Sequence, residues 1–370
     1  MKVAMLSPYA LSRPGGVQGQ VFGLAAALRR LGHEVVVIGP SDAGGDAGLG
    51  VVGSPGQVVV IGRPTGVRSN GSVAPVTLSP LAARRVERLV RRGGFDVAHL
   101  HEPLAPMAGY GLVLRAPVPM VGTYHRAGVS RWVSVLKPLA SWVGSRLMAR
   151  VAVSEAARET GERSGGGSFE VLFNGVDVAG AAPTEAVRDE SGRPAVFFVS
   201  RHETRKGLGV LLDAFALVEG PAVLWVASDG PETEALRQRH PESERVRWLG
   251  RLSEAEKAAW LAGASVLCAP SLGGESFGVV LLEGMAAGCV LVASDIEGYA
   301  AAAGGHAELV PPGDVAALAR ALEMSLADAV TGSGRSSVDA LKAALAHAEA
   351  WSMDALAARY VEVYERVVGG

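Results

Sequence analysis

The segment Gly273-Gly274-Glu275-Ser276-Phe277-Gly278 is the most distinctive group of small and polar residues in the chain. It follows an apolar stretch that predicts a strand and precedes a predicted helix that carries Glu283. At about 1.5 Å per helical residue, Glu275 and Glu283 are expected about 12 Å apart along the axis. Glycosidase carboxylates lie about 5–9.5 Å apart, so this spacing argues against a hydrolytic pair. It matches the reach from a hexose across a diphosphate to a ribose, with the helix N-terminus between them to hold phosphates.

Two further loops contain groups that could bind an anion. Pro14-Gly15-Gly16 lies between a predicted strand and helix, where glycine lets the backbone approach a ligand. A simple tight turn explains that loop equally well. The loop from Arg201 to Lys206 follows a predicted strand, at the end where α/β proteins bind ligands. Arg201 and Lys206, the cations at its two ends, suit the oxygens of a diphosphate, although a solvated loop would have the same composition.

Histidines form a third candidate group. His99 and His101 alternate along one predicted strand and therefore share a face, which is compatible with a metal site. The sequence has no second ligand cluster and no Asp-x-Asp pattern, so no metal is predicted. His125 follows an apolar run and is expected at a strand end, where a lone histidine more often has a structural role.

Alternating apolar patterns place these residues on a parallel sheet flanked by helices. Residues 3–6 and 35–38 read as buried strands, joined by a helix whose apolar stripe runs from Val17 to Leu31 and stops at Gly32. Residues 178–194 lack periodicity and predict a linker. A second series of strands follows at residues 196–199, 222–226, 265–268 and 290–292, and residues 353–368 read as a closing helix.

The pattern predicts an α/β protein with two Rossmann-like domains that face a central cleft. We expect an N-terminal domain over residues 1–178, a C-terminal domain over residues 179–349 and a closing helix over residues 350–370.

Composition excludes several classes of protein. Hydrophobic residues make up 49% and charged residues 19% of the 370 residues, which excludes wholesale disorder. Cys268 and Cys289 cannot make a disulfide scaffold and read as small buried hydrophobes. No signal peptide and no apolar run of about 20 residues is visible, so we expect a cytoplasmic protein.

The net charge of −2 conceals an asymmetry between the two halves. Residues 1–180 contain 19 basic against 11 acidic residues, and the remainder contains 16 against 26. Residues 63–92 and 126–150 are rich in arginine and poor in acids, and the second segment also contains tryptophan. Such segments suit adsorption to anionic lipid. A solvated helix face is the plainer alternative, and no aromatic motif of an RNA-binding protein supports nucleic acid as a partner.

Taken together, these motifs resemble the retaining glycosyltransferases of family 4, which have the GT-B fold. The resemblance covers essentially the whole chain and also includes Gly32-His33-Glu34-Val35 and Asn174-Gly175-Val176-Asp177. It implies a nucleotide-sugar donor bound by residues 179–349 and an N-terminal domain that faces the acceptor and a membrane. It also implies no obligatory metal cofactor, a monomer, and a final helix over residues 350–370 that packs back on the first domain. Within the family the likeness favours members that move mannose from GDP-mannose to an inositol phospholipid at the inner face of the cell membrane.

The resemblance also implies roles for individual residues. Gly16, Arg201 and Lys206 would contact the diphosphate, within a donor site that includes Ser276, Phe277 and Gly278. Glu275 would hold the hydroxyls of the transferred sugar, Glu283 the ribose, and His125 the sugar near the reaction centre. Tyr9 and Gln18 would face the inositol. Glu275, His125, Arg201 and Lys206 are thus the expected catalytic group.

Two departures from the family pattern leave alternatives open. His125 is followed by Arg126-Ala127-Gly128 in place of a hydroxyl-rich stretch, and the loop from Arg201 to Lys206 is one residue shorter than expected. A family member that uses a UDP-sugar and another acceptor therefore remains a second hypothesis. A nicotinamide-dependent oxidoreductase is a third, although the required G-x-G-x-x-G fingerprint is absent from the first loop.

Overall fold

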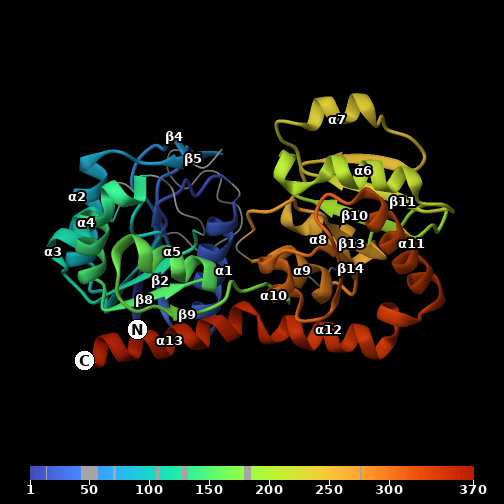
Figure 1. Cartoon of the computed structure of the whole chain (residues 1–370). Helices are drawn as coiled ribbons and strands as arrows, with labels where there is room; N and C mark the ends of the chain where they lie inside the picture. The colour runs from blue at the N-terminus through green and yellow to red at the C-terminus, as the bar shows by residue number, and fades with distance from the viewer. Residues whose placement is uncertain are drawn as a thin grey trace. The chain divides into compact units, whose positions relative to one another are not determined.

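The computed structural model describes residues 1–13, 15–42, 57–69, 72–105, 109–126, 132–178, 185–275 and 277–370. The side chains at 68–69, 72–74 and 132–136 are outside this description. Two compact units are present (Figure 1). Unit 1 contains residues 1–175 and 353–370, and unit 2 contains residues 176–352. The expected domain boundaries, after residue 178 and before residue 350, fall within a few residues of these.

Unit 1 is built on a seven-stranded sheet in the order β3-β2-β1-β6-β7-β8-β9. Its neighbouring strands pair in parallel, as the alternating sequence pattern predicts. A separate antiparallel hairpin joins β4 to β5. The strands are β1 Lys2–Leu6, β2 Glu34–Gly39, β3 Val58–Val60, β4 Thr65–Ser69, β5 Ser72–Val76, β6 Val97–His101, β7 Met120–Tyr124, β8 Ala149–Ala152 and β9 Glu170–Val171.

Side chains alternate across each strand, so apolar residues lie on both faces of this sheet. Helices cover both faces. In β1, Val3 and Met5 join the core formed with α1 and α13, whereas Ala4 and Leu6 join the core on the other face. Helix α13, red in Figure 1, thus packs within unit 1, as predicted for the closing helix. The helices are α1 Gly16–Arg30, α2 Pro80–Arg92, α3 Tyr110–Arg115, α4 Trp132–Ser145, α5 Glu155–Gly165 and α13 Met353–Gly369.

Unit 2 repeats the architecture with a six-stranded sheet in the order β12-β11-β10-β13-β14-β15. All its strand pairs are parallel. The strands are β10 Ala195–Val199, β11 Val223–Ala227, β12 Val246–Gly250, β13 Val266–Ala269, β14 Val290–Ser294 and β15 Ala307–Val310. The helices are η1 Thr204–Lys206, α6 Leu208–Leu217, α7 Thr233–Arg239, α8 Glu254–Gly263, α9 Val279–Ala286, α10 Glu297–Ala303, α11 Val315–Thr331, η2 Gly334–Ser336 and α12 Val338–Ala350.

The central strands of unit 2 are fully buried on both faces, which explains their continuous apolar sequences. Phe198 packs with α6 and α11 on one face. On the other face Trp225 contacts Trp260 of α8, with ring centroids 4.8 Å apart. Cys268 and Cys289 are both buried and free, which confirms their reading as small hydrophobes.

Every strand expected from the apolar runs is present, with ends shifted by one or two residues. The helix from Val17 ends as predicted, since Gly32 has a φ of +84° that favours glycine. The prediction missed β8, the β4–β5 hairpin and the edge strands β3, β9, β12 and β15, whose charged or short sequences give a weak signal. No helix in the described part of the chain has the length and apolar character needed to span a membrane.

Candidate functional site

The loop between β10 and α6 carries the predicted cations of unit 2. Its last residues form the single turn η1, and Lys206 is largely buried while Arg201 is exposed. Gly207 has a φ of +70°, and a Cβ there would overlap the carbonyl oxygen of Pro270. Glycine is therefore required for the loop to pack against the end of β13.

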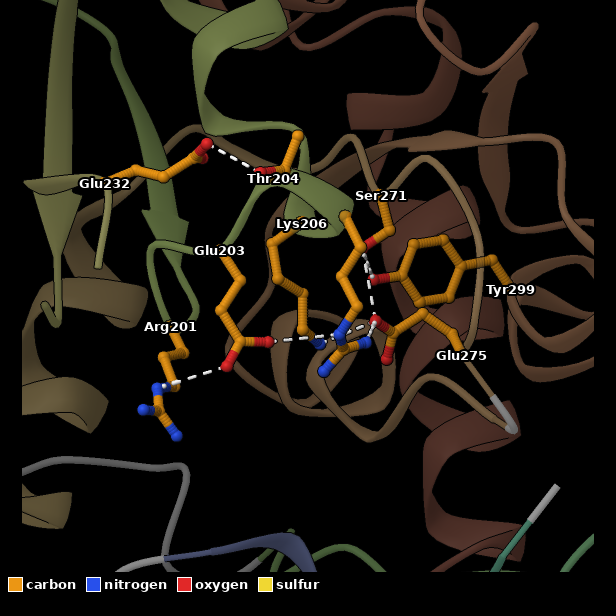
Figure 2. Close-up of polar contacts among 9 residues, drawn as sticks. Arg201, Glu203, Thr204, Lys206, Glu232, Ser271, Glu275 and Tyr299 are labelled. Carbon is orange, nitrogen blue, oxygen red and sulfur yellow. Dashed lines mark hydrogen bonds and ion pairs between the residues drawn. The ribbon is translucent and has the colours of Figure 1, made fainter. Parts of the chain in front are cut away.

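Two cations of this loop converge on Glu275, which follows β13 (Figure 2). The Lys206 Nζ lies 2.6 Å and the Arg205 guanidinium 2.8 Å from Glu275 Oε1. Lys206 and Glu275 expose 15% and 16% of their side chains, so bulk water screens this pair less than an exposed one. The structure thus brings together two of the predicted catalytic residues.

A second carboxylate organises the exposed side of the same loop. Glu203 lies 3.2 Å from the Arg201 guanidinium and 3.1 Å from that of Arg205. Figure 2 labels Glu203 and Arg201 and marks their contact with a dashed line. Thr204 donates a hydrogen bond to Glu232 at 2.6 Å. The loop therefore presents three cations whose positions are set by neighbouring acids, an arrangement suited to a spread of phosphate oxygens.

The backbone that carries Glu275 is held from behind by α10. Gly298 lies so close that a Cβ would be 2.5 Å from the Glu275 carbonyl oxygen. Tyr299 and Ser271 share a hydrogen bond of 2.8 Å between their hydroxyls, and Ser271 also reaches Glu275 at 3.4 Å. These contacts restrict where the carboxylate can lie.

The rest of the predicted motif leads into α9. Gly278 is the residue before the helix, and a Cβ there would be 2.9 Å from the Tyr299 ring, so glycine permits this close packing. The Phe277 side chain is buried with its ring 4.8 Å from that of Trp351, which leaves its backbone for any ligand contact. Ser276 lies outside the described residues.

Glu283, one turn into α9, pairs with a cation that the sequence reading missed. The Lys257 Nζ lies 3.0 Å from Glu283 Oε1 and 2.7 Å from Glu254. Burial raises the pKa of the Glu283 carboxyl, and Lys257 opposes this effect. Burial alone would lower the pKa of Lys257, but the two acids together raise it. Lys257 thus stays charged and fixes the Glu283 carboxylate.

In unit 1 the glycine loop forms the start of α1. Gly16 is the first helical residue, and a Cβ there would meet nothing within 4 Å, which leaves room beside the helix N-terminus. Gln18 is buried and donates a hydrogen bond to the Ala10 carbonyl at 3.2 Å. Burial raises the pKa of the Tyr9 hydroxyl, and Glu102 adds to this. Pro14 lies outside the described residues.

His125 follows β7, at the strand end predicted for it, and contacts the end of β6. Its Nε2 lies 2.8 Å from His101 Nδ1, and its backbone N–H donates to Glu102 at 2.6 Å. Burial lowers the pKa of His125 to about 4, which a hydrogen bond with Asn174 opposes. His125 is therefore neutral near pH 7.

His99 and His101 do share a face, with ring centroids 4.3 Å apart. His99 Nδ1 lies 2.7 Å from the Tyr364 hydroxyl and its Nε2 2.7 Å from the Thr123 hydroxyl, which in turn is 2.7 Å from Tyr360. These partners join β6 and β7 to α13. Within the described ranges no group of three metal-binding side chains is found.

The two predicted membrane segments differ in what their arginines contact. Helix α2 buries one face and exposes Arg84, Arg85, Arg88, Arg91 and Arg92 on the other. Arg150 instead donates to the carbonyls of Gly144 and Gly166 and therefore stabilises the fold. The expected role of Arg150 at a membrane stays a prediction. Ala127 to Arg131 lie outside the described residues, as do the side chains from Trp132 to Leu136.

The comparisons with known proteins place both units in one class of enzyme. Residues 14–179 match the family model described as Glycosyltransferase Family 4, and residues 193–328 match the model described as Glycosyl transferases group 1. Among solved structures, HepE from Anabaena in complex with UDP and glucose has a TM-score of 0.74 at 19% identity and covers 99% of this chain and 100% of that one. Sucrose-phosphate synthase from Thermosynechococcus elongatus has a TM-score of 0.77 at 20% identity, covering 100% and 99%. Two parallel-sheet units with these neighbours confirm the predicted GT-B fold of a glycosyltransferase.

Curated relatives narrow the assignment. The phosphatidyl-myo-inositol mannosyltransferase of Mycolicibacterium smegmatis is 35% identical over 377 residues, covering 100% of this chain and 95% of that protein. The enzyme of the same name from Mycobacterium leprae is 37% identical, covering 99% and 97%. The chain therefore belongs to glycosyltransferase family 4 and is similar along its whole length to phosphatidyl-myo-inositol mannosyltransferases. This assignment removes the oxidoreductase alternative.

Proposed function

We propose that this protein transfers mannose from GDP-mannose to phosphatidyl-myo-inositol, with retention at the anomeric carbon, at the cytoplasmic face of a membrane. The relatives named for that activity support the substrates, since the likeness to them extends over essentially the whole chain. In the structure, the pairing of Lys206 with Glu275 at 2.6 Å is the observation that favours a sugar nucleotide.

That pair supplies the two kinds of group a sugar diphosphate needs side by side. A cation binds the diphosphate, and an adjacent carboxylate accepts hydrogen bonds from sugar hydroxyls. Arg201 and the backbone N–H groups before α9 would add to the phosphate contacts. Glu283, held by Lys257 at 3.0 Å, would accept from the ribose hydroxyls.

The proposed reaction is a front-face displacement. A bond forms between an inositol oxygen and the anomeric carbon of mannose while the bond from that carbon to the diphosphate oxygen breaks. The proton of the attacking hydroxyl passes to the departing diphosphate oxygen. Lys206, Arg201 and the start of α9 stabilise the negative charge that develops on that oxygen. In this proposal the cations of the loop supply the charge, so we expect no requirement for a divalent metal.

Unit 1 is proposed to serve the acceptor. Tyr9 and Gln18 would line the inositol side, Gly16 would allow close approach of phosphate to the backbone, and His125 would contact the transferred sugar. Gln18 donates to the Ala10 carbonyl, and its carbonyl oxygen accepts no hydrogen bond from any residue that the structure describes, so this oxygen would accept from a hydroxyl of the inositol. The exposed arginines of α2 would bring this unit to an anionic membrane.

A donor and acceptor comparison tests the proposal. Purified protein is incubated with vesicles containing phosphatidylinositol, and GDP-mannose, UDP-glucose and UDP-N-acetylglucosamine are supplied in parallel. We expect a lipid product heavier by one hexose with GDP-mannose alone, and unchanged turnover in EDTA. Vesicles with phosphatidylglycerol at the same charge serve as the control and should give no product. Turnover only with a UDP-sugar would overturn the donor assignment while leaving the family intact.

A further inference from the structure

The end of β6 holds His125 by two independent contacts. His101 Nδ1 bonds the ring of His125 at 2.8 Å, and the neighbouring Glu102 accepts the backbone N–H of His125 at 2.6 Å. We propose that His101 and Glu102 are positioning residues that fix both the orientation and the tautomer of His125. The expected effect on turnover rests on the proposed function of His125 toward the transferred sugar.

The backbone at Glu102 is shaped for this contact. Its N–H continues the β6–β7 ladder by donating to the Thr123 carbonyl at 2.7 Å. Its φ then turns to +48°, a left-handed conformation that residues other than glycine rarely adopt. The chain turns there, and the buried Glu102 carboxyl accepts the backbone N–H of His125. Such strained conformations persist only where the surrounding structure holds them, and they are common at functional sites.

The tautomer follows from the two nitrogens of His101. A neutral imidazole carries one N–H, and His101 Nε2 is buried without a hydrogen-bond partner among the described residues. Leaving a buried N–H unpaired is less favourable than leaving a lone pair, so the proton of His101 belongs on Nδ1. His101 therefore donates to His125 Nε2, and His125 carries its own proton on Nδ1.

The surroundings keep both rings neutral. Burial lowers the pKa of His101 well below its usual value, and the neighbouring His99 and His125 lower it further. The ring of His101 is stacked on that of His99, with centroids 4.3 Å apart, and its edge meets the His125 ring through the hydrogen bond, with centroids 5.1 Å apart. A ring held on one face and by a hydrogen bond at its edge has little freedom to turn.

Amide substitutions of His101 separate this role from simple packing. The side-chain nitrogen of asparagine lies as many bonds from Cβ as Nδ1 of histidine, and that of glutamine as many as Nε2. His101→Asn should therefore retain the bond to His125, while His101→Gln and His101→Leu lose it. We expect kcat to fall about 10- to 100-fold in the latter two, with the KM for GDP-mannose changed much less, and to recover mostly in His101→Asn. Glu102→Gln, which still accepts the N–H, should likewise remain more active than Glu102→Ala.

A spectroscopic measurement tests the same point without turnover. Long-range ¹H–¹⁵N correlation of the histidine rings, assigned with His125→Gln, should show His125 protonated on Nδ1 in the parent protein. In His101→Leu we expect the Nε2–H form to appear. An unchanged tautomer in that variant, or an Nε2–H tautomer in the parent, would overturn the proposal. If the parent protein turns over none of the donors, the proposed function is wrong. The tautomer measurement would still test whether His101 orients His125.

Discussion

At the scale of single residues, Glu275 is the side chain on which the donor site of unit 2 depends. Its Oε1 is shared by Lys206 and Arg205, and the start of α9 follows it. Removing this carboxylate both loses a hydrogen-bond acceptor for the sugar and leaves a largely buried cation unpaired.

Glu275→Ala is expected to lower kcat by about 10²-fold or more, with the fold intact. Steady-state kinetics with GDP-mannose, together with the thermal midpoint of unfolding, check this prediction. Glu349→Ala, which removes an exposed carboxylate from α12, is the matched control and should behave as the parent. Near-normal turnover in Glu275→Ala would remove Glu275 from the catalytic group.

The sequence could identify Lys206 and Glu275 as site residues but not their contact. Their pairing depends on how the β10–α6 loop folds over the end of β13, which Gly207 and Pro270 decide through backbone packing. The sequence did not identify Arg205 as a partner of Glu275 or Lys257 as a partner of Glu283. An arginine in a polar loop and a lysine in a helix belong to no motif that would single them out. The spacing of His99 and His101 in the sequence suggests only a shared strand face, whereas the bond from His101 to His125 exists because β6 and β7 are neighbours in the sheet.

At the scale of elements, the buried histidines couple β6 and β7 to α13. Burial lowers the pKa of His99 to about 3 and that of His125 to about 4, and lowers that of His101 well below its usual value. In the unfolded chain these groups take up protons near pH 6.5. Their contribution to stability is therefore complete above about pH 6.5 and is lost as the pH falls toward the folded pKa values.

We expect unit 1 to lose on the order of 3 kcal/mol of stability between pH 6 and pH 5, at about 1.4 kcal/mol per group and pH unit. Hydrogen exchange of the α13 peptide, corrected for the intrinsic effect of pH, measures this loss. His99→Asn removes one of the three groups, so the slope should fall by about a third. An equal slope in that variant would contradict the assignment to His99.

Helix α10 supports the Glu275 loop from a position that the sequence did not indicate. A glycine inside a short helix has many explanations, and the contact with Glu275 arises because β13 and β14 are neighbours in the sheet. By contrast, the strands and the closing helix were predictable because their apolar patterns are local and long. The edge strands β12 and β15 were not, since less burial leaves a weaker apolar signal.

Gly298→Ala should displace the Glu275 backbone, because the added Cβ would lie 2.5 Å from the Glu275 carbonyl oxygen. We expect about a tenfold or larger loss of kcat with GDP-mannose, since small displacements of catalytic groups are costly. Gly209→Ala in α6 is the control, because its Cβ would make an ordinary contact at 3.5 Å. Unchanged kinetics in Gly298→Ala would show that the loop can move without loss of function.

At the scale of the whole molecule, charge is divided between the two halves of the chain. Residues 1–180 have an excess of eight basic residues, and the remainder has an excess of ten acidic residues. The basic excess includes the exposed face of α2, where Arg84, Arg85, Arg88 and Arg92 make no ion pair with any residue that the structure describes. Arg91, in contrast, is paired with Glu87 at 2.9 Å. Long-range attraction to an anionic surface should therefore act on unit 1 and not on unit 2.

We predict that α2 binds vesicles containing anionic phospholipid. Each basic residue near such a surface contributes about 1 kcal/mol, so replacing four by serine should weaken binding by about two to three orders of magnitude. Binding of the parent should also weaken between 0.1 M and 1 M salt, as the Debye length shortens from about 10 Å to about 3 Å. Co-sedimentation with vesicles measures the salt effect in the parent and the loss of binding in the variant that replaces Arg84, Arg85, Arg88 and Arg92.

A matched control removes four exposed cations from the acidic half, namely Arg237, Arg251, Arg320 and Lys342, with the same change in net charge. If the two variants lose binding equally, net charge and not α2 directs the protein to the membrane. If neither does, the arginines of α2 serve solubility, and support for a lipid acceptor weakens with them.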